Sequence, residues 1–65
     1  MEYSRKQILE ILYEYIHVRK DRDVMILYLT DRPRSLEELA EICDLSVSTV
    51  KRIINRNSFI YKYMP

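Results

Sequence analysis

The chain has 65 residues, which allows one small domain and leaves no room for a second domain or a deep cofactor cleft, since a chain of this size buries only about 60% of its unfolded surface. Its 48% apolar and 32% charged residues supply both a packed core and a solvated surface, which excludes a disordered chain. The net charge is +1 and glycine is absent, so neither a phosphate-cradling loop nor a fold built on tight β-hairpins is expected.

The first predicted element is an amphipathic helix over residues 4–20. Its apolar arc spans roughly 200°, well beyond the ~100° that a helix needs to pack one side on a core. The helix is therefore either enclosed within the domain or in contact with another chain, unless its tyrosines simply lie at the edges of the arc with their hydroxyls in water. The surface predicted for a contact between two copies consists of Leu9, Tyr13 and Ile16.

The second predicted helix covers residues 22–31. Asp21 or Asp23 is the expected N-cap, because an aspartate side chain accepts a backbone N–H at a helix start. The run VMILYL that follows is apolar throughout, which indicates a buried element. Pro33 excludes the right-handed helical conformation at Arg32, so this helix should end near residue 30 or 31.

Two short helices are predicted next, at residues 35–43 and 46–57. Ser35 and Glu38 have the spacing of a capping box, in which each side chain accepts a backbone N–H. Ser46 is the N-cap expected for the second of these helices. Asp44 lies in the turn between them, where a left-handed residue is required, and aspartate tolerates that conformation. Two short helices joined by such a turn form a helix-turn-helix, whose second helix fits the major groove of DNA.

Residues 35–56 resemble the helix-turn-helix of bacterial and phage transcription regulators, most closely in the run LSVSTVKRII. With the preceding DVMILYL they also show a weaker likeness to region four of bacterial sigma factors. The resemblance implies that Ala40 lies where the two helices touch and that Leu45, Val50 and Ile53 are buried anchors. It also implies that the following residues face DNA: Ser46, Val47, Ser48, Lys51, Arg52 and Asn55.

The outward positions of the second helix support DNA binding independently of the resemblance. Short side chains near its start let the helix approach base edges, and longer basic ones reach guanine or phosphate. We predict that Arg52 pairs with guanine and that Arg56 contacts a phosphate. The predicted DNA-binding residues are therefore Ser46, Val47, Ser48, Thr49, Lys51, Arg52, Asn55 and Arg56.

Charge is distributed unevenly along the chain. Residues 35–44 hold four acidic residues and no basic one, whereas residues 45–65 hold four basic residues and no acidic one. A basic last third favours a polyanionic partner. The aromatic residues near the end, at 59–63, alternate with a strand-like spacing that leaves the conformation of residues 58–65 open, and they are expected either to fold over the core or to join a partner. Asn57 could end the preceding helix in a left-handed conformation.

Other functions have little support in the sequence. Cys43 is interpreted as a small core residue, and a single cysteine cannot form an internal disulfide, which is typical of the reducing cytoplasm. His17 has no second ligand in register, so no metal site, cofactor or catalytic centre is expected. No stretch of about 18 apolar residues predicts a membrane span, and the start MEYSRKQ lacks the features of a secretory signal.

The sequence therefore predicts a single all-α domain, residues 1–65, with four helices and a helix-turn-helix motif at 35–56. Its predicted function is sequence-specific binding of double-stranded DNA as a small transcription regulator, from a phage or another mobile element, with residues 46–57 in the major groove. A homodimer formed through helix 4–20 or through the aromatic tail is expected. The alternative is a protein-interaction module, such as an antirepressor, that binds another protein through the apolar face of helix 4–20.

Overall fold

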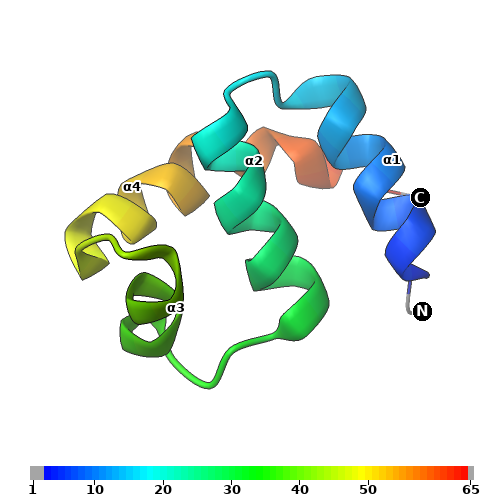
Figure 1. The fold of residues 1–65 in the computed structure, drawn as a ribbon. Helices are drawn as coiled ribbons and strands as arrows, with labels where there is room; N and C mark the ends of the chain where they lie inside the picture. The colour runs from blue at the N-terminus through cyan, green and yellow to red at the C-terminus, as the bar shows by residue number, and fades with distance from the viewer. Residues whose placement is uncertain (1–2, 65) are drawn as a thin grey trace.

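A computed structural model describes residues 3–64, which are helical apart from short connections and contain no β-strand (Figure 1). This confirms the predicted all-α class and the four helices, although several of their bounds differ. The elements in chain order are α1 (Arg5–Tyr15), α2 (Arg19–Ile26), a π-helical turn η1 (Leu27–Asp31), α3 (Leu36–Cys43), α4 (Val47–Arg56) and a 3₁₀ helix η2 (Ser58–Tyr63).

Helix α1 is shorter than the predicted helix 4–20. It begins at a capping box, in which the Ser4 hydroxyl accepts the N–H of Gln7 at 3.1 Å and the Gln7 side chain accepts the N–H of Ser4 at 2.9 Å. It ends at Tyr15, because Ile16 adopts an extended conformation (φ −114°, ψ 109°). The apolar periodicity was misleading beyond this point: Val18, which the predicted helix 4–20 includes, lies outside α1 and is 59% exposed.

Helix α2 begins three residues earlier than predicted and has a different cap. Val18 is its N-cap and provides no side-chain hydrogen bond, so the prediction that Asp21 or Asp23 caps the helix is wrong. Both aspartates lie within the helix, and Asp21 is buried. The helical segment continues through η1 and ends at Asp31, as the position of Pro33 predicted.

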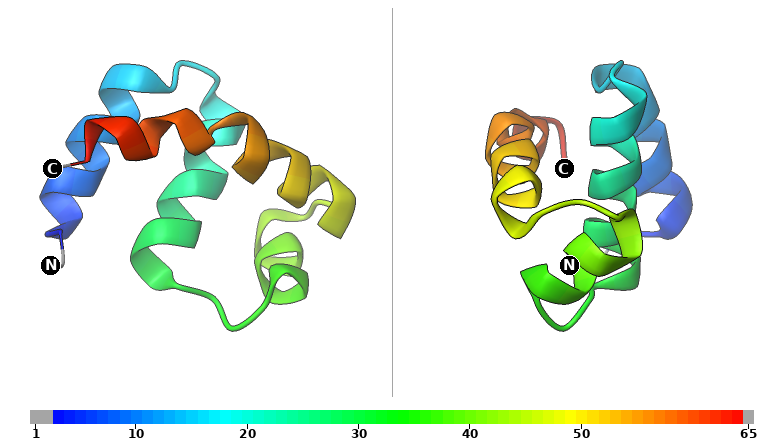
Figure 2. Two further views of the ribbon diagram at one scale, coloured as in Figure 1. Left: turned by 180° about the vertical axis from the view of Figure 1, so that it is seen from behind. Right: turned by 60° about the vertical axis from the view of Figure 1, so that its left-hand side comes forward.

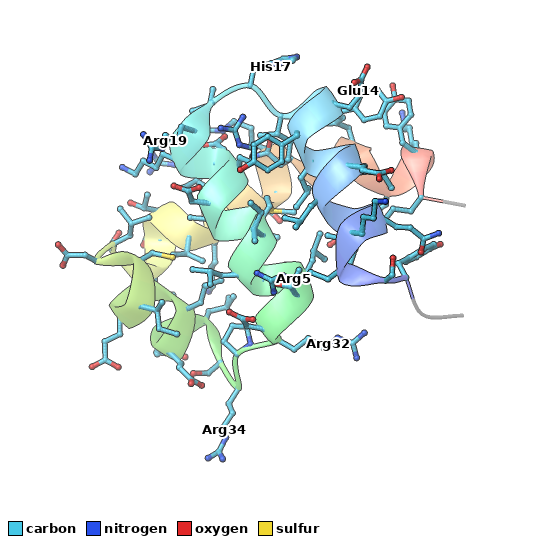
Figure 3. All side chains as sticks on the ribbon, turned by 45° about the vertical axis from the view of Figure 1, so that its right-hand side comes forward. Arg5, Glu14, His17, Arg19, Arg32 and Arg34 are labelled. Carbon is cyan, nitrogen blue, oxygen red and sulfur yellow. The ribbon has the colours of Figure 1, made fainter. Side chains whose placement is uncertain are left out.

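Arg32 and Pro33 lead from η1 towards α3. Arg32 is outside the right-handed helical region, as predicted, and takes a left-handed conformation (φ 47°, ψ 64°). The Thr30 hydroxyl donates to the Ile26 carbonyl at 2.6 Å within the preceding turn. Arg34, in the loop that follows, projects away from the helices (Figure 3).

Helix α2 connects the two halves of the core. It runs between α1 on one side and the α3–α4 pair on the other (Figure 1). Met25 packs in one buried cluster with residues of α1 and η2, and Val24 packs in a second cluster with residues of α3 and α4. Each large apolar side chain buried in this way contributes roughly 1.5–3 kcal/mol of transfer free energy. The motif is thus fixed to the rest of the molecule through α2.

The C-terminal segment folds back on α1 as a 3₁₀ helix, so its strand-like spacing did not predict its conformation. It continues from α4 across the molecule to α1 (Figure 2). Ile60 is fully buried in the cluster with α1, and the ring of Tyr63 stacks on that of Tyr15 with centroids 3.8 Å apart. The apolar contacts of Ile60 with α1 thus anchor this segment, whereas its aromatic side chains, Phe59, Tyr61 and Tyr63, stay 38–47% exposed.

The apolar surface that α1 exposes to solvent is smaller than its predicted apolar arc of roughly 200° suggested. Ile16, predicted to lie in a contact between two copies, is buried within the chain, so that part of the prediction is wrong. Tyr13 is 57% exposed, and the Arg22 guanidinium lies 4.2 Å from the centre of its ring. Leu9 is half-buried. Within residues 3–64, no helix is both long enough and apolar enough to cross a lipid bilayer.

Candidate nucleic-acid interface

Two side-chain hydrogen bonds cap the start of α3. The Ser35 hydroxyl accepts the N–H of Glu38 at 3.1 Å, as predicted, but the Glu38 carboxylate accepts the N–H of Arg34 at 2.8 Å instead of that of Ser35. The reciprocal capping box is therefore incomplete, because the second acceptor reaches one residue further back. Both bonds still satisfy free N–H groups at the entrance to α3.

The turn between the two helices has the geometry that the sequence predicted. Asp44 is left-handed (φ 57°, ψ 46°). Its N–H donates to the carbonyl of Glu41 at 3.2 Å, and the N–H of Leu45 donates to that of Ala40 at 2.9 Å. These two bonds are those of a Schellman motif, which closes the end of a helix around one left-handed residue. The left-handed residue thus ends α3 and turns the chain into the start of α4.

Ser46 is the N-cap of helix α4, as predicted. The Ser46 hydroxyl accepts the N–H of Thr49 at 3.1 Å and lies 2.8 Å from the Thr49 hydroxyl. Ser46 remains exposed, and Thr49 is half-buried beside it. Two of the residues predicted to contact DNA therefore also stabilise the start of the helix.

The inner face of α4 holds the buried anchors. Val50 and Ile53 are buried against Leu39 and Ala40 of α3 and Val24 of α2, while Leu45 is partly buried at the edge of this cluster. These are the anchor positions that the resemblance implied. The small side chain of Ala40 lies in the cluster that joins the two helices, where it lets their backbones approach closely.

The outer face of α4 is polar and basic. Four of the residues predicted to contact DNA are exposed along it: Ser48, Lys51, Arg52 and Asn55. Val47 is half-buried at the start of the helix. No ion pair is formed by Lys51 or Arg52 with any residue in the 3–64 range, so both positive charges are open to solvent. This surface combines short side chains with two unpaired cations, as a helix in a major groove requires.

Arg56 differs from the other basic residues of α4. Its Nε and Nη2 donate to the two carboxylate oxygens of Asp21 on α2, at 2.8 and 2.7 Å. The side chain of Asp21 is 4% exposed and that of Arg56 is 55% exposed. The predicted phosphate contact of Arg56 stays a prediction, and the structure adds an intramolecular partner that competes for its guanidinium.

Asn57 completes this contact at the end of α4. Its Nδ2 donates to Asp21 Oδ2 at 2.9 Å and to the Ile53 carbonyl at 2.8 Å. It does not take the left-handed conformation that was considered for it, since its φ is −102°. Asn57 is buried, and its amide stabilises the helix end through these two bonds.

Two opposing effects act on the pKa of Asp21. Burial raises it, but hydrogen bonds from Arg56 and Asn57 and the positive charges of Arg56 and Lys20 outweigh burial, and the net pKa is below the ordinary 3.8. Asp21 is therefore ionised at neutral pH. Its contribution to folding is present above the ordinary carboxyl range and is lost as the pH falls through the lowered pKa.

Sequence reasoning missed the Asp21–Arg56 pair because it lies 35 positions apart in the chain. One signal was present in the sequence. Asp21 precedes the buried Val24 and Met25 by three and four residues, which puts a carboxylate on the apolar face of its helix. Such a carboxylate needs a cationic or hydrogen-bonding partner when it is buried.

Two other groups that the sequence singles out are Cys43 and His17. Burial and the charge of Asp23 raise the pKa of the Cys43 thiol, which favours its protonated form at neutral pH. His17 points outward from the turn between α1 and α2 (Figure 3). Among residues 3–64 there is no group of three histidine, cysteine or acidic side chains that would hold a metal ion.

Comparison with known proteins identifies the motif. Residues 19–56 match the family model of sigma-70, region 4, which covers α2, η1, α3 and α4 and thus more than half of the chain. Comparisons with curated proteins and with solved structures gave no match.

Proposed function

The chain belongs to the sigma-70 region 4 family of helix-turn-helix DNA-binding domains, and from this premise we propose that it binds double-stranded DNA sequence-specifically as a small transcription regulator. The observation that carries the proposal is the outer face of α4, where Lys51 and Arg52 are exposed and unpaired on a helix fixed by the motif. Region 4 domains are typically not enzymes, and the proposed role is binding alone, in the cytoplasm.

We propose that α4 enters the major groove with its N-terminal half. The short side chains near its start allow close approach, and Arg52 lies one turn further along, where a guanidinium can pair with the O6 and N7 of guanine. Lys51 then contacts a phosphate. The proposed DNA surface consists of Ser46, Val47, Ser48, Thr49, Lys51, Arg52 and Asn55, with Arg56 limited to the atoms that Asp21 leaves free.

The charges of α3 favour the same orientation. Glu37 and Glu41 are exposed on α3 and line, with Ser46 and Val47, a shallow hollow beside the start of α4. Acidic side chains next to a phosphate backbone are repelled by it. The favourable contacts are therefore concentrated on α4, and α3 stays further from the duplex.

A single motif reads only a few base pairs, and we propose that two copies pair on DNA. Two-fold pairing places two recognition helices about 34 Å apart, one turn of the duplex. With Ile16 buried, the exposed surface available on α1 is that of Leu9 and Tyr13, and Tyr61 and Tyr63 provide further exposed aromatic area on η2. The same area is what a protein-interaction module would use, so the alternative function rests on this face.

DNA binding by Lys51→Ala and Arg52→Ala across a salt series separates the two functions. Arg52→Ala is expected to cost about 1–3 kcal/mol on a selected duplex and to relax base preference, while Lys51→Ala weakens selected and random DNA alike and lowers the salt slope by about one. Lys6→Ala, an exposed cation on α1, is the control. Unchanged affinity of both α4 variants, with circular dichroism intact, would replace DNA binding with the protein-interaction function.

A further inference from the structure

Asp21 of α2 is hydrogen-bonded to the C-terminal end of α4, away from the exposed face of that helix. Its two carboxylate oxygens accept from the Nε and Nη2 of Arg56, and one of them also accepts from the Asn57 amide. A bidentate pair of this kind fixes the direction of a guanidinium as well as its distance. Arg56 is the last residue of α4 and Asn57 is its C-cap, so the contact holds the C-terminal end of the recognition helix on α2.

The pair is asymmetric in its exposure. The Asp21 side chain is almost completely enclosed, whereas more than half of the Arg56 side chain is in solvent. A buried carboxylate that lost its cation would remain uncompensated in the interior, so the folded chain strongly favours the paired state. Arg56 thus has an exposed position but a neutralised charge.

The positions of the cations on α4 agree with this difference between Arg56, which is paired, and Lys51 and Arg52, which are not. Ser48, Arg52 and Asn55 follow one another at three- and four-residue spacings on the exposed face, opposite the buried Val50 and Ile53. Arg56 lies on the flank of that face, and its guanidinium is turned to α2. The cations of α4 that remain available to DNA are then Lys51 and Arg52.

We propose that Asp21 is a positioning residue of the DNA-binding site: it fixes the end of α4 on α2 and withholds the charge of Arg56 from DNA. The inference rests on the proposed function and specifies which cations of α4 contact DNA. The number of cations that contact phosphates sets the salt dependence of binding, so this number can be measured. It also gives a reason for an acidic residue within a domain that binds a polyanion. Asp21 removes a non-specific contact and leaves discrimination to the central face of α4.

Two variants test the proposal on the full chain by the salt dependence of binding to random duplex DNA. Asp21→Asn keeps the shape of the side chain but releases the charge of Arg56, and the salt slope should steepen by about one unit. The double variant Asp21→Asn with Arg56→Gln replaces the ion pair by two neutral amides, and its slope should equal that of the unsubstituted protein. A purely structural role of Asp21 would lower affinity without steepening the slope.

Two results would overturn the proposal, and a third would reject the proposed function on which it rests. A slope for the double variant about one unit shallower than that of the unsubstituted protein would mean that Arg56 itself contacts a phosphate. An unchanged slope for Asp21→Asn, folded by circular dichroism, would mean that Asp21 does not withhold the charge. If Asp21→Asn alone does not fold, the comparison of the double variant with the unsubstituted protein decides. Absence of DNA binding by the unsubstituted protein at low salt would instead reject the proposed function, and this inference with it.

Discussion

Helices α3 and α4 are built alike and differ in what they present to solvent. Each begins at a serine whose hydroxyl accepts a backbone N–H three residues later at 3.1 Å, and each buries its inner face in the cluster around Leu39 and Ile53. The outer face of α3 presents Glu37 and Glu41, whereas that of α4 presents unpaired cations. The fold of the motif therefore depends on the shared features, and the proposed DNA binding by α4 depends on the difference in charge.

The largest expected effect tests the shared core. Leu39→Ala and Ile53→Ala should each lower the free energy of unfolding by about 2–5 kcal/mol, because both side chains are buried and leave a cavity. Chemical denaturation, with an osmolyte added if a variant is partly unfolded, measures the change. Ile42→Ala on the exposed side of α3 is the control and should change stability by at most about 0.5 kcal/mol. A small loss at one buried site alone would show that the two helices do not share one core.

The serine caps separate stability from binding. Ser35→Ala and Ser46→Ala should each cost about 1 kcal/mol of stability, since each leaves a backbone N–H at the helix start without its acceptor. Aspartate also caps helices, so Ser35→Asp and Ser46→Asp should restore stability. Only Ser46→Asp should weaken DNA binding, because it places a negative charge at the proposed DNA surface. Equal binding by both aspartate variants would contradict the assignment of the two helices.

The sequence was sufficient for the motif and insufficient for the contacts that surround it. Caps and turns depend on residues close in the chain, so Ser35, Asp44 and Ser46 were predictable from their spacing. The end of α1 was not, because the apolar periodicity continues through Ile16, which is buried in an extended conformation. At the candidate site, the exposed cations followed from periodicity.

The exception at the candidate site is Arg56. Its neutralisation depends on the position of α2 relative to α4, which no local pattern specifies. The 3₁₀ conformation of η2 has the same kind of origin, since burial of Ile60 and stacking of Tyr63 on α1 both depend on tertiary packing. Local patterns thus located the helix proposed to bind DNA, and long-range contacts decide which of its charges are unpaired.

The ends of the two helices provide the next comparison. Asp44→Gly should raise stability by about 0.5–1 kcal/mol, because glycine adopts the left-handed conformation without a Cβ clash. Asn57→Gly should lower it, since Asn57 is not left-handed and its amide makes two hydrogen bonds that glycine cannot make. Thermal unfolding should therefore show a higher melting temperature for Asp44→Gly and a lower one for Asn57→Gly than for the unsubstituted protein. A loss of stability in Asp44→Gly would mean that the Asp44 carboxylate contributes a stabilising interaction of its own.

The smallest expected effect tests the difference in charge. Neutralising the exposed acids of α3, as Glu37→Gln with Glu41→Gln, should strengthen binding to random DNA at low salt. Two unit charges about 10 Å apart in water interact by only about 0.4 kcal/mol, and screening at about 0.15 M salt removes most of that. The gain should therefore be a few tenths of a kcal/mol per charge and should disappear as salt is raised. Glu10→Gln, exposed on α1, is the control and should bind as the unsubstituted protein does. A gain that persists at high salt would mean that these acids touch the duplex, which would place α3 as close to the phosphates as α4.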